Sequence, residues 1–161
     1  MTLEVLTWLI AIPMLGFITG MRTMTPIAVL CWFGWLRLLP LDPWATWAGK
    51  LPVALAFTLL AAIEYAADKY GRSPRPTRPA FLMLRVFLGG LVGAIIATSL
   101  DAPTSEGIIL GLLGALVGAF VAYELRHQLT HRLGCKVWHV TLAEDIFAIF
   151  CAIVCMGIVT G

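Results

Sequence analysis

Apolar residues dominate long stretches of the chain, and charged residues are confined to short intervals between them. Six stretches contain no charged residue: residues 5–21, 23–36, 51–63, 86–100, 107–123 and 146–161. A helix needs about 20 apolar residues to cross the hydrocarbon layer of a membrane, at about 1.5 Å per residue. Several of these stretches are shorter, so either flanking residues complete the spans or some helices are broken.

The pattern predicts an all-α, polytopic transmembrane helical bundle of about five to six segments with a discontinuous first helix. The expected segments are residues 3–20, 25–39, 51–69, 81–100, 106–127 and 140–160. Among them, 25–39 is the weakest candidate for a full span. Together they form a single transmembrane domain, residues 1–161, with cytoplasmic loops at residues 70–80 and 128–139.

Composition excludes a soluble globular domain, because 60% of the residues are hydrophobic and only 12% are charged. A cleavable signal peptide is not expected, since Glu4 occupies the region where a positive charge would come first, and the first basic residue is Arg22. The cysteines form no CxxC pair and no metal-binding spacing, so we expect them to be structural. They are Cys31, Cys135, Cys151 and Cys155.

Basic residues gather in two intervals that are separated by two predicted helices. The first interval surrounds the proline-rich sequence YGRSPRPTRP, and the second begins at the end of the fifth segment. Their members are Lys69, Arg72, Arg75, Arg78 and Arg85, and then Arg126, Arg132 and Lys136. The positive-inside rule places both intervals in the cytoplasm. The proline-rich loop either serves only as a topology signal or also contacts anionic lipid head groups or a phosphate-bearing ligand.

The sequence GFITGMRTMTP interrupts the first apolar region. The residues that predict a helix break there are Gly20, Thr23, Thr25 and Pro26. Arg22 places a charge within the break, which needs a partner where water is scarce. If the break is a turn at the cytoplasmic surface, both termini are external. If residues 5–38 form one long broken helix, Arg22 lies within the bilayer and the N-terminus is cytoplasmic.

Glycines recur at helical spacing and predict close helix packing, because a helix without side chains on one stripe lets a neighbour approach. One stripe belongs to the fifth segment, and two GxxxG pairs lie in the first and fourth segments. The glycines are Gly107, Gly111, Gly114 and Gly118, then Gly16 with Gly20, and Gly89 with Gly93. Such faces serve packing within the bundle or homo-oligomerisation.

Two sets of three segments are compatible with an inverted repeat, as in many secondary transporters. The sequence GFITG in the first half is loosely echoed by GGLVG in the second half. An odd number of spans in each repeat would reverse the orientation of the second half.

Acidic residues near the cytoplasmic ends of the segments are candidate functional groups. Glu64 and Asp68 are spaced i, i+4 on one helix face, and Arg22 is their natural partner. Asp145 is a further expected partner of Arg22 across the bundle. Glu144 and Asp145 are expected to begin the last helix, where Thr141 would cap it and the acids would complement the helix dipole. A functional acid at a cytoplasmic vestibule is the alternative.

Glu124, His127 and His131 are expected on one face at the end of the fifth segment. A Glu-x-x-His pair of this kind ligates metals in helical bundles, but only with matching ligands from other helices. Glu144, Asp145 and His139 are the available contributors. We therefore keep Glu124 as a candidate functional charge and predict no metal and no cofactor.

Three motifs carry a resemblance to a known family: GMRTMTP, the ExxxDK pattern at residues 64–69, and AED at residues 143–145. With them the chain resembles a family of small bacterial integral membrane proteins catalogued as a domain of unknown function. The matching positions are Gly20, Arg22, Pro26, Glu64, Asp68, Lys69, Glu144 and Asp145. The resemblance implies a multi-helix protein of the inner membrane and supplies no activity.

Two classes of function fit these features. The first is a small transporter or permeation protein for an anionic or proton-coupled solute, because broken helices in membranes line cavities or pack within protein. The second is a helix-packing scaffold or accessory subunit of a membrane complex. An enzyme acting on lipid phosphate is less favoured, because Lys69 and Arg75 lack the rest of a phosphatase signature. The expected partners are lipids, a small molecule or ion, and a second copy of the chain, but not nucleic acid.

Overall fold

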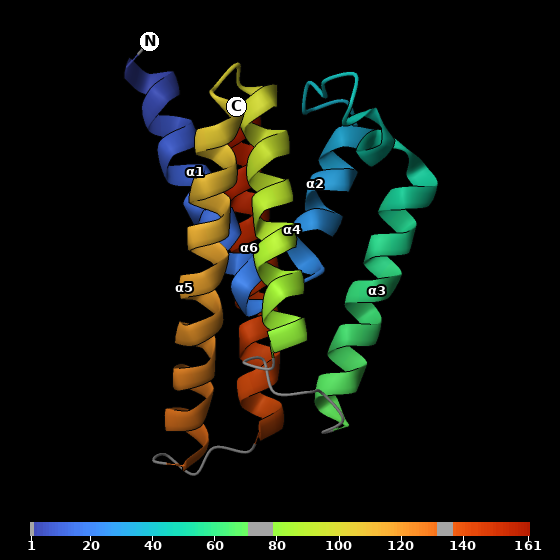
Figure 1. Cartoon of the computed structure of the whole chain (residues 1–161). Helices are drawn as coiled ribbons and strands as arrows, with labels where there is room; N and C mark the ends of the chain where they lie inside the picture. Colours follow the sequence, from blue (N-terminus) through green and yellow to red (C-terminus); the bar gives the residue numbers. More distant parts are fainter. Residues whose placement is uncertain (1, 71–78, 132–136) are drawn as a thin grey trace.

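The computed structural model describes residues 2–70, 79–131 and 137–161, and these ranges contain helices and no strand. The helices are α1 (Thr2–Met21), α2 (Thr25–Trp35), the short 3-10 helix η1 (Thr46–Gly49), α3 (Leu51–Lys69), α4 (Pro79–Ser99), α5 (Thr104–His131) and α6 (Val137–Thr160) (Figure 1). The predicted all-helical bundle is confirmed. Most of the two basic loops, with Arg72, Arg75, Arg78, Arg132, Cys135 and Lys136, lies outside the described residues.

The chain reverses direction between α1 and α2. In Figure 1, α1 descends from the end of the bundle where both termini lie, and α2 returns toward the same end. The alternative in which residues 5–38 form one long, broken helix is therefore wrong, because α1 and α2 run in opposite directions. α2 ends at Trp35, four residues earlier than expected, and Arg37 then adopts a left-handed φ of 57°. A residue in this conformation stops the helical hydrogen-bond pattern.

Within the described ranges, four helical stretches are long and apolar enough to cross a membrane: Leu51–Lys69, Pro79–Ser99, Thr104–Leu129 and His139–Thr160. α1 and α2 add two shorter apolar stretches, Val5–Met21 and Thr25–Trp35. Large apolar side chains face outward along the bundle, such as Phe87 at 66% and Phe150 at 65% exposure, whereas Arg22 is 1% exposed. This distribution suits a hydrocarbon environment. The chain is a multi-pass membrane protein.

α1, α4 and α5 form a tightly packed group in which glycines lie at the helix contacts. A Cβ added to Gly16 would lie 2.6 Å from the Gly111 carbonyl oxygen, and one added to Gly89 would lie 2.7 Å from the same oxygen. Gly93 and Gly107 face each other across α4 and α5, and Gly114 and Gly118 approach the backbone of α1 at Pro13 and Phe17. These distances leave no room for side chains, so the glycines set the helix separation.

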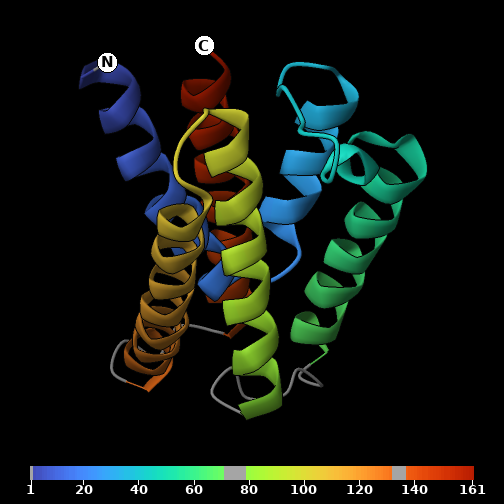
Figure 2. The same cartoon turned by 45° about the horizontal axis from the view of Figure 1, so that its top comes forward.

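α2, α3 and η1 form a second group, and α6 lies between the two groups in contact with α1 and α2 (Figure 2). Successive helices alternate in direction, which an inverted repeat of three plus three helices requires. The packing does not follow that repeat, because α4 and α5 pack along their length whereas their counterparts α1 and α2 touch only briefly.

Candidate functional site

The break between α1 and α2 frees backbone groups, and two charged side chains from other helices satisfy them. An Nη1–H of Arg85 on α4 donates hydrogen bonds to the Gly20 oxygen at 2.5 Å and the Met21 oxygen at 3.3 Å. The carboxylate of Glu64 on α3 accepts hydrogen bonds from the backbone N–H groups of Thr23 and Met24, both at 3.1 Å. The cation thus meets the negative end of α1, and the anion meets the positive end of α2.

The local sequence explains why side chains from other helices must satisfy the backbone groups of the break. Met24 occupies the N-cap position of α2 and offers no side-chain hydrogen bond to the first turn. Pro26 follows in the first turn, where its missing N–H is tolerated because that group would have no partner within the helix. Glu64 therefore supplies the cap that the local sequence lacks.

Arg22 lies inside the bundle directly after α1. Its guanidinium forms ion pairs with Asp68 of α3 and Asp145 of α6, and its Nη2 lies 4.0 Å from the Glu144 carboxylate. The same Nη2 donates to the Thr141 oxygen at 3.4 Å. With 1% of its side chain exposed, Arg22 depends on these partners to offset the loss of hydration.

An aromatic residue completes the surroundings of Arg22. The guanidinium carbon lies 5.4 Å from the centre of the Tyr65 ring, within the range of a cation–π contact. The Tyr65 hydroxyl lies 2.6 Å from Oγ1 of Thr25, at the start of α2. Tyr65 therefore joins α3 to both sides of the helix break.

Arg126 of α5 extends the network toward the loops. Its Nη2 lies 2.6 Å from the Glu144 carboxylate and 3.3 Å from the Asp68 carboxylate. The structure therefore brings seven charged residues from α3, α4, α5, α6 and the helix break into one group, which we call the charge cluster. Its members are Arg22, Glu64, Asp68, Arg85, Arg126, Glu144 and Asp145.

The charge cluster begins well inside the bundle. Gly20 contacts α5 at Ala115 and Ala119, and α5 continues to His131. At 1.5 Å per residue, the helix extends about 18 Å beyond Ala119. Figure 1 likewise shows the turn between α1 and α2 ending short of the lower ends of α3, α5 and α6. The turn with Arg22 is therefore buried and does not lie at the surface of the bundle.

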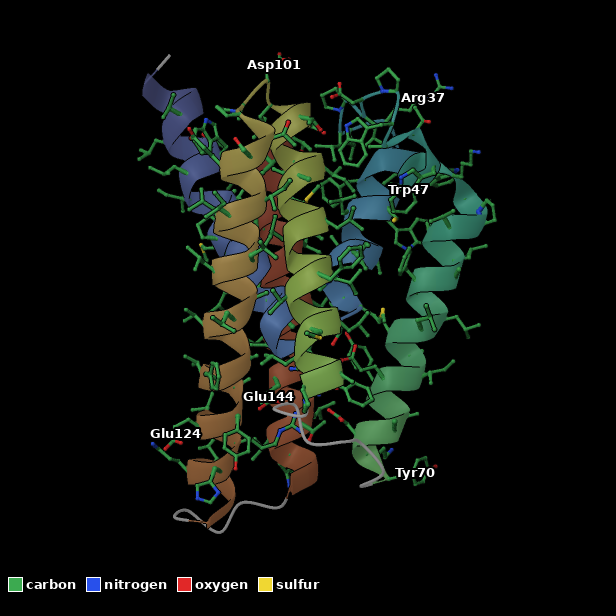
Figure 3. All side chains as sticks on the ribbon, viewed as in Figure 1. Arg37, Trp47, Tyr70, Asp101, Glu124 and Glu144 are labelled. Carbon is green, nitrogen blue, oxygen red and sulfur yellow. The ribbon has the colours of Figure 1, made fainter. Side chains whose placement is uncertain are left out.

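Five of the six charges singled out in the sequence meet in the charge cluster, and Glu124 does not. Glu124 is exposed and accepts a hydrogen bond from Gln128 at 2.8 Å (Figure 3). The ring of His127 stacks on Tyr123 with 6.3 Å between ring centres. The described ranges contain no group of His, Cys, Asp and Glu residues arranged to hold a metal ion. The side chain of His131 lies outside them.

Two expectations from the sequence need correction. Arg22 pairs with Asp68 and Asp145, whereas Glu64, its other expected partner, binds the amides of α2. Thr141 does not cap the last helix, because α6 begins four residues earlier, at Val137. The acids that follow Thr141 consequently lie within the helix and not at its start.

Sequence reasoning missed three members of this site: Arg85, Arg126 and Tyr65. Both arginines were interpreted only as topology signals beside the loops. For Arg85 a signal was present, since it lies six residues inside α4 and is followed by an uninterrupted apolar stretch. A basic residue inside a spanning helix is expected to have a specific partner. Tyr65 carried no comparable signal.

A crevice between α3 and α6 leads toward the charge cluster. It has a volume of about 350 Å³ and is lined by Tyr65 and Lys69 of α3 and by Thr141 and Asp145 of α6. The side chain of Asp145 is 13% exposed, more than those of Arg22, Asp68 and Glu144. Asp145 is thus the most accessible ion-pair partner of Arg22.

The fold and the site define a class of protein: a multi-pass helical membrane protein organised around buried ion pairs at a helix break. A family model described as a domain of unknown function (DUF4126) matches residues 9–158, and the chain belongs to this family. The family expected from the sequence is therefore confirmed. No curated protein and no solved structure matches the chain.

Proposed function

We propose that this protein is a proton-coupled carrier of a small solute in the bacterial inner membrane, with the charge cluster as its coupling site. The observation that supports this proposal best is the pairing of Arg22 with carboxylates from two different helices, Asp68 of α3 and Asp145 of α6. Ionisable groups inside a membrane are costly and commonly mark proton or substrate pathways.

The geometry suggests how a proton would be coupled to movement. Arg22 belongs to the break between α1 and α2, whereas its partners belong to α3 and α6. Protonation of Asp145 would remove its negative charge and weaken its attraction to Arg22. The contact between the α1–α2 hairpin and α6 would then loosen. A proton bound at Asp145 would thus change the preferred arrangement of the helices, as coupled transport requires.

The same geometry favours proton coupling over recognition of an anion by Arg22. An anion bound at this site would need the Arg22 guanidinium and the backbone amides at the start of α2 as donors. The guanidinium is engaged with Asp68 and Asp145, and the amides of Thr23 and Met24 are engaged with Glu64. Carboxylates of the chain already occupy the groups that would bind the anion.

Proteoliposomes that contain a pH-sensitive dye would test this proposal. The purified protein is reconstituted, and pools of amines, carboxylic acids, amino acids and sugars are added under a clamped membrane potential. We expect at least one pool to change the internal pH through the wild-type protein. Arg22→Ala and Asp145→Asn should abolish this change, while Glu124→Gln should behave as wild type because Glu124 lies outside the charge cluster.

Two outcomes would contradict the proposal. If no pool moves protons through a folded, inserted protein that copurifies with a stable partner, the chain is an accessory subunit. If protons move equally well through Arg22→Ala and Asp145→Asn, the charge cluster is not the coupling site.

A further inference from the structure

A second crevice lies between α1, α5 and α6, on the side of α6 away from the α3 crevice. It has a volume of about 430 Å³, and its walls include Phe17 and Met21 of α1, Val121 and Leu125 of α5, and Phe147 of α6. Val121, Leu125 and Phe147 are also exposed on the outside of the bundle, so the crevice opens toward the surrounding lipid. Its volume lies within the range of about 300–1,000 Å³ that is usual for small-molecule sites.

Glu144 is among the residues that line this apolar crevice, and its carboxylate is incompletely satisfied. Its Oε2 binds Arg126 at 2.6 Å, but its Oε1 is buried without a hydrogen-bond partner in the described ranges. The Glu144 side chain is 5% exposed, and Figure 3 shows it on α6 beside α5. A buried carboxylate oxygen without a donor is unfavourable, so a ligand that supplies one would gain binding energy.

We propose that this crevice binds an apolar amine in its protonated form, with an ammonium N–H donating to Glu144 Oε1 and the hydrocarbon part along the crevice walls. A charged donor forms a stronger hydrogen bond to a carboxylate than a neutral hydroxyl does. An anionic amphiphile would place its charge against Glu144 and is disfavoured. The apolar walls contribute through burial of the hydrocarbon.

This inference rests on the proposed function, since the amine would be the solute that is exchanged for a proton. The charged groups around Glu144 are Arg126 of α5, Arg22 at the helix break and Asp145 of α6, with Asp68 of α3 sharing Arg126. A bound ammonium group would therefore lie beside the ion pairs of the charge cluster.

A binding assay with tritiated 4-phenylbutylamine tests the inference on the full-length protein in nanodiscs of uncharged lipid. We expect saturable binding that unlabelled amine displaces, that 4-phenylbutanol displaces at least tenfold more weakly, and that 4-phenylbutyrate does not displace. Glu144→Gln should weaken binding at least tenfold, whereas Glu124→Gln should bind as wild type. Equal displacement by the alcohol, or wild-type binding by Glu144→Gln, would overturn the inference.

A second pair of variants leaves every charge in place. Ala143 lines the same crevice, so Ala143→Phe should fill it and weaken binding at least tenfold. Ala62 is an exposed alanine on α3, and Ala62→Phe should bind as wild type. Wild-type binding by Ala143→Phe would contradict the site.

The results separate this inference from the proposed function. If the amine binds in a way that depends on Glu144 and Ala143 but no protons move, the binding site is supported and the proposed carrier function is rejected. Proton movement with another solute, without amine binding at the crevice, rejects the inference alone.

Discussion

The carboxylate of Glu64 accepts a hydrogen bond from the backbone N–H of Thr23 at 3.1 Å, although the two residues are 41 positions apart in the sequence. Its other oxygen accepts from Met24. One side chain of α3 therefore satisfies two amides of the helix break, where the N-cap residue Met24 makes no side-chain hydrogen bond. Arg85 has the converse role, because its guanidinium donates hydrogen bonds to the carbonyl groups at the end of α1.

Removal of this cap should destabilise the helix break. Glu64→Ala leaves two partly buried amides without acceptors, and we expect the free energy of unfolding to fall by about 1–3 kcal/mol. Glu64→Gln retains one acceptor oxygen and should cost less. Thermal unfolding of the detergent-solubilised protein measures both effects. Glu124→Ala is the control and should unfold as wild type, because Glu124 is exposed. A wild-type unfolding temperature for Glu64→Ala would contradict the capping role.

Loss of Arg22 should be more costly than loss of the cap. Arg22→Ala leaves the buried Asp68 and the partly buried Asp145 without this cation, and we expect the free energy of unfolding to fall by about 3–5 kcal/mol. Adding Asp145→Asn removes one of the uncompensated charges and should restore part of the stability. A double-mutant cycle measured by chemical denaturation in detergent gives the coupling between the two residues. Strictly additive effects would show that the ion pair contributes nothing.

Glycine substitutions should separate tight helix contacts from loose ones. Gly16→Ala would place its Cβ 2.6 Å from the Gly111 oxygen, a backbone atom that can move only with its helix. We expect a loss of about 1–3 kcal/mol in unfolding free energy, typical of overpacking. Gly157→Ala is the matched control, because no atom of the described residues lies within 4 Å of its added Cβ. Alanine is the better helix former, so this control should be neutral or slightly stabilising. Equal unfolding temperatures for the two variants would contradict the close packing of α1 on α5.

Cysteine labelling should show the orientation of the bundle in the membrane. With the four native cysteines replaced by alanine, Ser105→Cys at the start of α5 and Tyr70→Cys after α3 introduce exposed thiols at opposite ends of the bundle. A membrane-impermeant maleimide added to intact cells should label position 105, and position 70 only after permeabilisation. Labelling of both from one side would contradict the fold. Labelling of position 70 in intact cells, with position 105 labelled only after permeabilisation, would contradict the orientation expected from the basic residues.

Much of the architecture could be predicted from local information. The apolar stretches located the helices, because each stretch must be long enough to bury its own backbone groups in lipid. Pro26 and its neighbouring threonines indicated where the first helix breaks. The glycines of α5 indicated a face for close packing, but the sequence did not specify that α1 and α4 both occupy it.

The partners of Arg22 were less accessible to sequence reasoning. Asp145 was among the expected partners, but Asp68 and Glu64 lie one helical turn apart on the same helix, and spacing alone cannot decide which faces the guanidinium and which faces the amides. Arg126 was interpreted only as a topology signal at the end of the fifth segment. It points back toward Glu144 since its long side chain can reach the carboxylates from the end of α5.

The sequence by itself determined that the chain lies in a membrane, where its helices fall and where the first of them breaks, because these properties depend on runs of neighbouring residues. Only the tertiary structure decided that the break turns back within the bundle and that seven charges from five parts of the chain meet beside it. The physical reason is desolvation. A buried charge needs a partner that offsets its lost hydration, and the packing of distant helices decides which residue lies close enough. The sequence of a single segment does not contain that information.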